Sequence, residues 1–164
     1  MPKGKIPKEK IIADVLIFAV HKEESAIRFY SRLAEQIQDA EATLVFLNLA
    51  RDEGIHRQTL EQWWRNQFNK PFPFDINMVD ERKAEIDSQA GALAALDLAL
   101  EAEEASAKHY VALAKLTKDK KLAKLCTRLA DEEWGHFETI NAEKNAIIES
   151  FYWFDVDHSA YLED

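Results

Sequence analysis

The sequence repeats itself, and this duplication constrains the fold more than any other feature of the chain. When the sequence is shifted by 80 residues without a gap, residues 14–65 align with residues 94–145, and 13 of the 52 aligned positions are identical. Chance would give about three or four identities. The identical pairs include Glu23/Glu103, Glu24/Glu104, Tyr30/Tyr110, Asp39/Asp119, Leu49/Leu129, Glu53/Glu133 and His56/His136. Each half is therefore predicted to form the same two-helix unit.

Apolar residues recur in each half at the alternating three- and four-residue steps of amphipathic helices. The stripes of the first half are Ile12, Leu16, Ala19, Glu23, Ala26, Tyr30, Leu33 and Ile37, followed by Ala42, Phe46, Leu49, Glu53, His56, Leu60 and Trp63. Those of the second half are Ala92, Leu96, Ala99, Glu103, Ser106, Tyr110 and Leu113, followed by Leu122, Cys126, Leu129, Glu133, His136 and Ile140. Four helices of roughly 20 to 30 residues are expected.

Four such helices bury their stripes best against one another, which predicts an all-α four-helix bundle. Residues 66–86 are longer than a helical hairpin needs and are interpreted as a crossover between the second and third helices, although an elaborate local loop would also satisfy the sequence. We expect one domain over residues 1–164, with the bundle at about 9–148. The aromatic tail, residues 149–164, is expected to pack back on the bundle or onto a second subunit.

Composition excludes several classes of protein. The net charge of −9 disfavours nucleic acid as a partner, and no apolar run is long enough for a signal peptide or membrane span. The single cysteine, Cys126, leaves no internal disulfide and no CxxC metal site. The expectation is a soluble cytoplasmic protein.

Four glutamates interrupt the apolar stripes: Glu23, Glu53, Glu103 and Glu133. A buried, unpaired carboxylate costs several kcal/mol, so core packing does not explain four of them. The midpoints of the two hairpins fall beside Asp39 and Asp119, which places the four carboxylates at one height in the bundle. Acids off the stripes, including Glu24, Asp52, Glu104 and Glu132, are interpreted as solvated, and so are His21, His109 and His158.

Metal ions are the expected source of compensating charge. His56 and His136 each follow a stripe glutamate by three residues and so project into the same layer. No lysine or arginine lies on the stripes near it. Four carboxylates and two imidazoles suit two divalent ions, iron or manganese better than calcium or a structural zinc.

The repeated Glu…Tyr helix followed by a Glu-x-x-His helix resembles the rubrerythrin branch of the ferritin-like superfamily. The motif spans Glu23 to Tyr30 and Glu53 to His56 in one half, and Glu103 to Tyr110 and Glu133 to His136 in the other. The resemblance implies a di-iron centre in which Glu23 and Glu103 are terminal ligands, Glu53 and Glu133 bridge the ions, and each histidine caps one ion. Manganese or zinc could occupy the same positions.

Two departures from the family pattern bear on function. Rubrerythrins carry a C-terminal rubredoxin-like domain with four cysteines, which is absent here, so an external electron donor such as rubredoxin is expected. They also carry a further ligand glutamate one turn after that of the third helix, where this chain has Ser106, with Ala26 at the equivalent place in the first half.

The expected function is a di-iron oxidoreductase, acting as a homodimer, that reduces hydrogen peroxide or dioxygen at a ferrous pair. An alternative from the storage class is a ferroxidase that feeds a mineral core, and a third is a purely structural metal site. Tyr30 and Tyr110 lie two turns beyond their glutamates. Each phenol either reaches a ligand carboxylate and supports it, or is simply a tyrosine of the apolar core.

Overall fold

The computed structural model describes residues 7–81 and 91–159, with side chains up to Phe151. It contains four long helices, α1 (Lys8–Gln36), α2 (Ala40–Phe68), α3 (Gly91–Leu116) and α4 (Lys120–Ser159), and the short 3₁₀ helix η1 (Ile76–Met78). The described residues contain no strand. The predicted all-α four-helix bundle is confirmed.

Each hairpin turns where the duplicated aspartate begins its second helix. The Asp39 side chain accepts a hydrogen bond from the backbone N–H of Ala42 at 2.8 Å. Asp119 accepts from the backbone N–H groups of Lys121 and Leu122, both at 3.0 Å. An aspartate before a helix satisfies N–H groups that have no partner within the helix, so it fixes where the helix starts. Both turns lie at the predicted midpoints.

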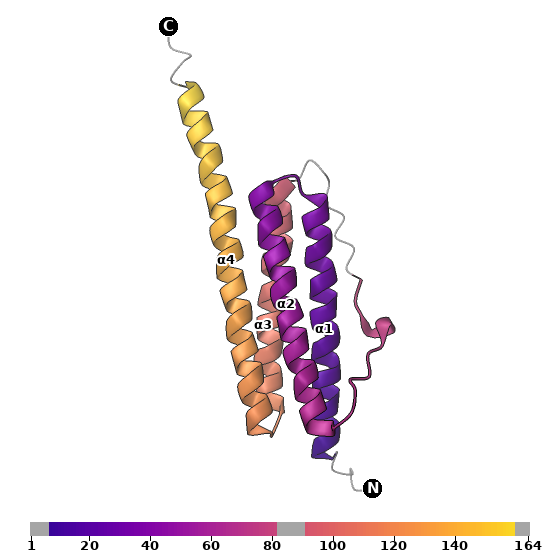
Figure 1. The fold of residues 1–164 in the computed structure, drawn as a ribbon. Helices are drawn as coiled ribbons and strands as arrows, with labels where there is room; N and C mark the ends of the chain where they lie inside the picture. Colours follow the sequence, from indigo (N-terminus) through magenta and orange to yellow (C-terminus); the bar gives the residue numbers. More distant parts are fainter. Residues whose placement is uncertain (1–6, 82–90, 160–164) are drawn as a thin grey trace, which may run out of the picture.

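The connection from α2 to α3 is a crossover (Figure 1). Asn69, at φ 52°, ends α2 in the left-handed conformation that asparagine tolerates. The chain then climbs along α1: the backbone N–H of Asp75 donates to His21 Nε2 at 3.0 Å, and that of Asp80 donates to Ser25 Oγ at 2.8 Å. As a result, α2 and α3 run in the same direction (Figure 1).

His21 corrects the sequence interpretation, which placed it at the surface. It is buried, and its Nδ1 lies 2.6 Å from the carbonyl oxygen of Ile17. Its ring stacks on that of Phe74 with a centroid distance of 5.1 Å. The crossover covers this histidine. The periodicity of α1 shows which face packs on the other helices, but it does not show that a loop far away in sequence covers another face.

The core consists of two apolar clusters separated by a polar layer. One contains Leu16, Leu60, Leu122 and Leu129, toward the end where α3 meets α4. The other contains Leu33, Phe46, Leu96 and Ile140, toward the end where α1 meets α2. The stripe glutamates lie between them in sequence on every helix. Water is therefore excluded from both ends of the polar layer.

The fourth helix continues beyond residue 148, where the sequence interpretation ended the bundle. The C-terminal part of α4 extends past the other three helices (Figure 1), and Phe151 is exposed on it. Residues 149–159 are therefore helical. The predicted packing of aromatic side chains beyond Phe151 lies outside the described residues. None of the described helices is long and apolar enough to cross a membrane.

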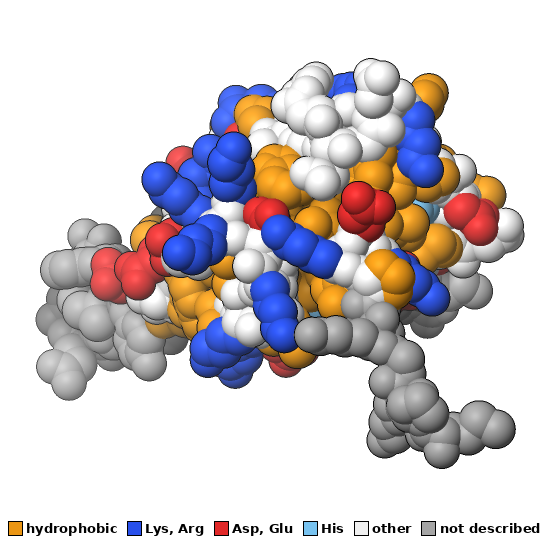
Figure 2. Space-filling view, turned by 90° about the horizontal axis from the view of Figure 1, so that it is seen from below, with side chains coloured by type: hydrophobic (Ala, Val, Ile, Leu, Met, Phe, Trp, Pro, Cys, Tyr) orange, Lys and Arg blue, Asp and Glu red, His pale blue; other side chains and the backbone are white. Residues whose placement is uncertain are grey.

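Charge is unevenly distributed over the molecule. Viewed from the end where α3 meets α4, lysine and arginine side chains gather around the tips of the helices (Figure 2). Lys8 pairs there with Asp119 at 3.1 Å, and the neighbouring turn contains Lys118, Lys120 and Lys121. This end is basic although the chain carries a net charge of −9.

Candidate metal centre

The four stripe glutamates meet in the middle of the bundle, one from each helix. Glu23, Glu53, Glu103 and Glu133 each have 2 % or less of their surface exposed. Since the periodicity of each helix points these positions inward and the duplicated hairpins have equal lengths, the four carboxylates reach the same height. The expected convergence is present.

His56 and His136 complete the cluster from α2 and α4. Nδ1 of His56 lies 3.0 Å from a carboxylate oxygen of Glu53 and 3.4 Å from one of Glu133. Nδ1 of His136 lies 3.3 Å from Glu133 and 3.5 Å from Glu103. The two rings stack at a centroid distance of 5.6 Å. In both histidines, Nδ1 is the nitrogen that faces the carboxylates.

These six residues form two overlapping groups. Glu23, Glu53, His56 and Glu133 each offer a ligand atom within 4.8 Å of the others, and so do Glu53, Glu103, Glu133 and His136. Glu53 and Glu133 belong to both groups. The arrangement could hold two cations that share two carboxylates, each ion having one further glutamate and one histidine of its own.

The outer nitrogens of the histidines contact two acids that sequence reasoning assigned to solvent. Nε2 of His56 lies 2.7 Å from a carboxylate oxygen of Glu132, and Nε2 of His136 lies 3.6 Å from one of Asp52. A carboxylate at Nε2 holds the proton there and leaves Nδ1 free for a metal. The duplication could have indicated this role, because an acid directly precedes the glutamate of the Glu-x-x-His motif in both halves.

Tyr30 and Tyr110 support the glutamates of the opposite repeat. The buried Tyr30 hydroxyl donates to Glu103, and the buried Tyr110 hydroxyl donates to Glu23. Burial, followed by the charge of the bonded glutamate, raises the pKa of each phenol well above its usual value. Both tyrosines therefore stay protonated and act as hydrogen-bond donors.

Protons balance the cluster when no cation is bound. Burial and the neighbouring charges of Glu53 and Glu133 raise the pKa of Glu23 well above its usual value. Burial by itself would raise the pKa of Glu133, but hydrogen bonds from His136 and His56 outweigh it and hold that pKa at about 2. Although burial opposes it, hydrogen bonding to Glu133 and Glu53 raises the pKa of His56 to about 11. Metal binding must displace these protons.

The donor set fits metal ions. Among the described residues, the ion pairs to the four stripe glutamates come from the two histidines and from no lysine or arginine. One buried oxygen of Glu103 and one of Glu133 have no hydrogen-bond partner in this part of the chain. Carboxylate oxygens with imidazole nitrogens suit iron, manganese or zinc.

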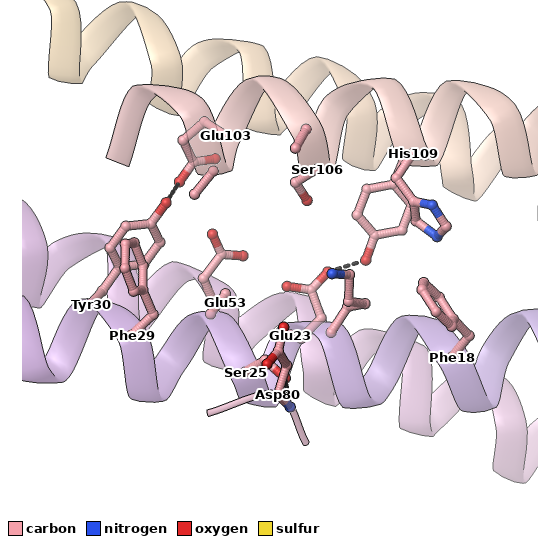
Figure 3. A pocket seen from close by; sticks show the side chains of 15 residues that line it. Phe18, Glu23, Ser25, Phe29, Tyr30, Glu53, Asp80, Glu103, Ser106 and His109 are labelled. Carbon is pink, nitrogen blue, oxygen red and sulfur yellow. Dashed lines mark hydrogen bonds between the residues drawn. The ribbon is translucent and has the colours of Figure 1, made fainter. Parts of the chain in front are cut away.

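A pocket reaches the cluster from the side where α1 faces α3 (Figure 3). Its volume is about 240 Å³, and Glu23, Glu53 and Glu103 contribute to its lining. Ala26 and Ser106, both small, lie one helical turn after Glu23 and Glu103 and also line it.

Comparisons with known proteins agree with this geometry. The Rubrerythrin family model matches residues 14–144. The solved structure of a hypothetical protein from Pyrococcus furiosus is similar, with 26 % sequence identity, a TM-score of 0.66, and coverage of 88 % of this chain and 98 % of that one. No curated protein matches this chain.

Proposed function

Because the chain belongs to the rubrerythrin family, we propose that it is a di-iron carboxylate oxidoreductase that reduces hydrogen peroxide or dioxygen. The single observation that supports this most strongly is the pair of buried ligand groups that share Glu53 and Glu133. A ferrous pair would supply the two electrons that cleave the O–O bond of hydrogen peroxide, with two protons giving two molecules of water.

Each repeat would contribute half of the ligands. Glu23 and His56 would hold one ion and Glu103 and His136 the other, while Glu53 and Glu133 would bridge the two. The tyrosine hydroxyls orient the two terminal carboxylates. Glu132, 2.7 Å from Nε2 of His56, would help to keep Nδ1 of that imidazole turned toward an ion, and Asp52 lies on the same outer side of His136 at 3.6 Å.

Rapid oxidation of the iron tests the proposal. Ferrous-loaded protein, mixed anaerobically with hydrogen peroxide, should be oxidised much faster than ferrous iron held by the variant Glu53→Gln/Glu133→Gln, as followed by the near-ultraviolet absorbance of ferric iron. Glu104→Gln is the matched control, because Glu104 pairs with Lys108 at the surface. Equal rates in wild type and double variant would leave only a structural role for the metal.

A ferroxidase that feeds an iron store is the second candidate. The two ligand groups have the same composition, three glutamates and one histidine, and Ala26 and Ser106 stand where a further acid could make them differ. This symmetry favours the ferroxidase. Storage requires a closed shell of many subunits, whereas we propose a homodimer for the redox enzyme. Sedimentation of the metal-loaded protein separates the two, since a large shell would favour storage.

The remaining partners follow from the proposed redox role. An external protein such as rubredoxin would reduce the ferric pair, and elemental analysis of protein purified without oxygen would test for iron against manganese or zinc. We place the protein in the cytoplasm because its single cysteine suits a reducing compartment. Burial raises the pKa of the Cys126 thiol to about 11, so it is an unreactive core side chain.

A further inference from the structure

The pocket between α1 and α3 is larger than the proposed oxidants require. A water molecule occupies about 30 Å³ in the liquid, and an engineered apolar cavity of about 150 Å³ holds benzene. The pocket measures about 240 Å³. It could therefore hold a molecule somewhat larger than benzene beside the carboxylate cluster.

Within the described residues, the pocket lies on the α1 and α3 side of the cluster. On the side of α2 and α4, the stacked rings of His56 and His136 cover the carboxylates, and Glu132 and Asp52 lie outside them. On the side of α1 and α3, the small side chains of Ala26, Ser106 and Ala105 leave space, and Ala105 is exposed to solvent. A substrate would reach the cluster from this open side.

The walls of the pocket are mainly apolar and its base is polar. Phe18 and Phe29 lie toward opposite ends of the pocket, with Glu23 and Glu53 between them (Figure 3). At the end near Phe18, the ring of His109 lies 4.6 Å from that of Phe18 between centroids. Nε2 of His109 is buried without a hydrogen-bond partner among the described residues. It offers a ligand one hydrogen bond.

We propose that this pocket binds an organic hydroperoxide whose compact apolar group lies against Ala26 and Phe29 while its hydroperoxyl group faces the glutamates. The inference rests on the proposed function and specifies its substrate class. Reduction of ROOH would break its O–O bond: a ferrous pair held by the cluster would supply the two electrons, and two protons would complete the alcohol ROH and water. Hydrogen peroxide would leave the apolar walls of the pocket wetted by solvent.

Binding can be measured without turnover. The probe is cumyl alcohol, the product expected from cumene hydroperoxide, added to zinc-loaded protein and detected by saturation-transfer NMR. Wild type should bind it. Ala26→Leu and Ser106→Leu, which fill the pocket from opposite helices, should each weaken binding by about tenfold or more. Ala112→Leu is the matched control, since Ala112 is exposed on α3 and does not line the pocket.

Turnover provides the second test. In iron-loaded protein, Ala26→Leu should lower kcat/KM for cumene hydroperoxide by about tenfold more than it lowers kcat/KM for hydrogen peroxide. Ala112→Leu should change neither. Helical circular dichroism and a content of two metal ions per chain establish that each variant is folded and loaded.

The outcomes separate this inference from the proposed function. If wild type oxidises its iron with hydrogen peroxide but neither binds cumyl alcohol nor reduces cumene hydroperoxide, the organic substrate is wrong and the di-iron function stands. An equal loss for both peroxides in Ala26→Leu would also overturn the inference. If no peroxide oxidises the iron, the proposed function fails, and NMR with the zinc-loaded protein still decides whether the pocket binds the alcohol.

Discussion

At the scale of single residues, the tyrosines connect the two repeats. Tyr30, in the first repeat, donates to Glu103 in the second, and Tyr110 donates to Glu23. Each bond joins a neutral donor to a carboxylate in the interior, where an unpaired acceptor is costly. The tyrosines therefore help to fix the position of one glutamate in each ligand group.

A double-mutant cycle measures this crossed pairing. Tyr110→Phe keeps the ring and removes the hydroxyl, so it should destabilise zinc-loaded protein by about 1–3 kcal/mol. The loss should be smaller when Glu23→Gln is already present, because the two residues share one bond. Urea unfolding gives the energies. The cycle of Tyr110→Phe with Glu103→Gln is the control, and a larger coupling in that cycle would contradict the crossed arrangement.

The acids behind the histidines are expected to strengthen metal binding. Glu132→Gln removes the carboxylate that lies 2.7 Å from Nε2 of His56, and should weaken metal binding by about 10- to 100-fold. Asp52→Asn should have a smaller effect, since its carboxylate lies 3.6 Å from His136. Competition with a chromophoric chelator measures both affinities. Glu104→Gln, at a half-exposed position that pairs with Lys108, serves as control, and an equal affinity in all three variants would contradict this role for the two acids.

At the scale of the helices, the duplicated aspartates decide where α2 and α4 begin. Asp39 and Asp119 each accept hydrogen bonds from the first turn of the helix that follows. The short turns they create place the glutamates of each hairpin side by side. The two aspartate caps therefore help to align the glutamates of the cluster, although neither aspartate contacts it.

Removal of either cap should cost stability in similar amounts. Asp39→Ala and Asp119→Ala should each destabilise the protein by about 1 kcal/mol, and asparagine, which caps equally well, should restore most of the loss. Thermal unfolding at neutral pH gives the comparison. If the asparagine variants were as unstable as the alanine variants, the capping hydrogen bond would not be the cause.

The Asp119 cap should also depend on pH. Hydrogen bonds from the Leu122 backbone N–H and from Lys8 lower the pKa of its carboxyl group in the folded state. Its stabilising contribution is therefore complete above the ordinary aspartate pKa of about 3.9 and is lost as the pH falls through the lowered value. The difference in unfolding free energy between wild type and Asp119→Asn should shrink on acidification below that pH. A difference that grows instead would reverse the assigned sign.

At the scale of the whole molecule, the polar layer divides an otherwise apolar interior. Two apolar clusters flank it, and within the described chain the counter-charges of its four carboxylates are the two histidines. Metal-free protein must balance the layer with protons, which partly satisfy its buried oxygens. Cations should therefore contribute much of the stability of the fold.

Metal removal tests this contribution. Each bound ion should stabilise the fold by about 2.7 kcal/mol when free metal exceeds the dissociation constant by about 100-fold. For two ions, the melting temperature should rise by roughly 10–20 °C over that of chelated protein. The variant Glu53→Gln/Glu133→Gln should lose this shift. Equal melting temperatures of metal-loaded and chelated wild type would contradict a layer held together by cations.

Much of this architecture follows from the sequence alone. The helical periodicity indicates which face of each helix is buried, and the duplication equalises the hairpins, so Glu23, Glu53, Glu103 and Glu133 could be assigned to one layer before any coordinates. These are local properties, determined by residues within a turn or two of one another.

The remaining features depended on how the helices rotate and pack against one another. Tertiary structure decided that each tyrosine bonds to the other repeat, that Asp52 and Glu132 reach the histidines, and that the crossover buries His21. It also decided that α1 and α3 leave a pocket while α2 and α4 close over the cluster. These contacts join residues distant in sequence, and a helix presents the same stripe whichever neighbour it meets.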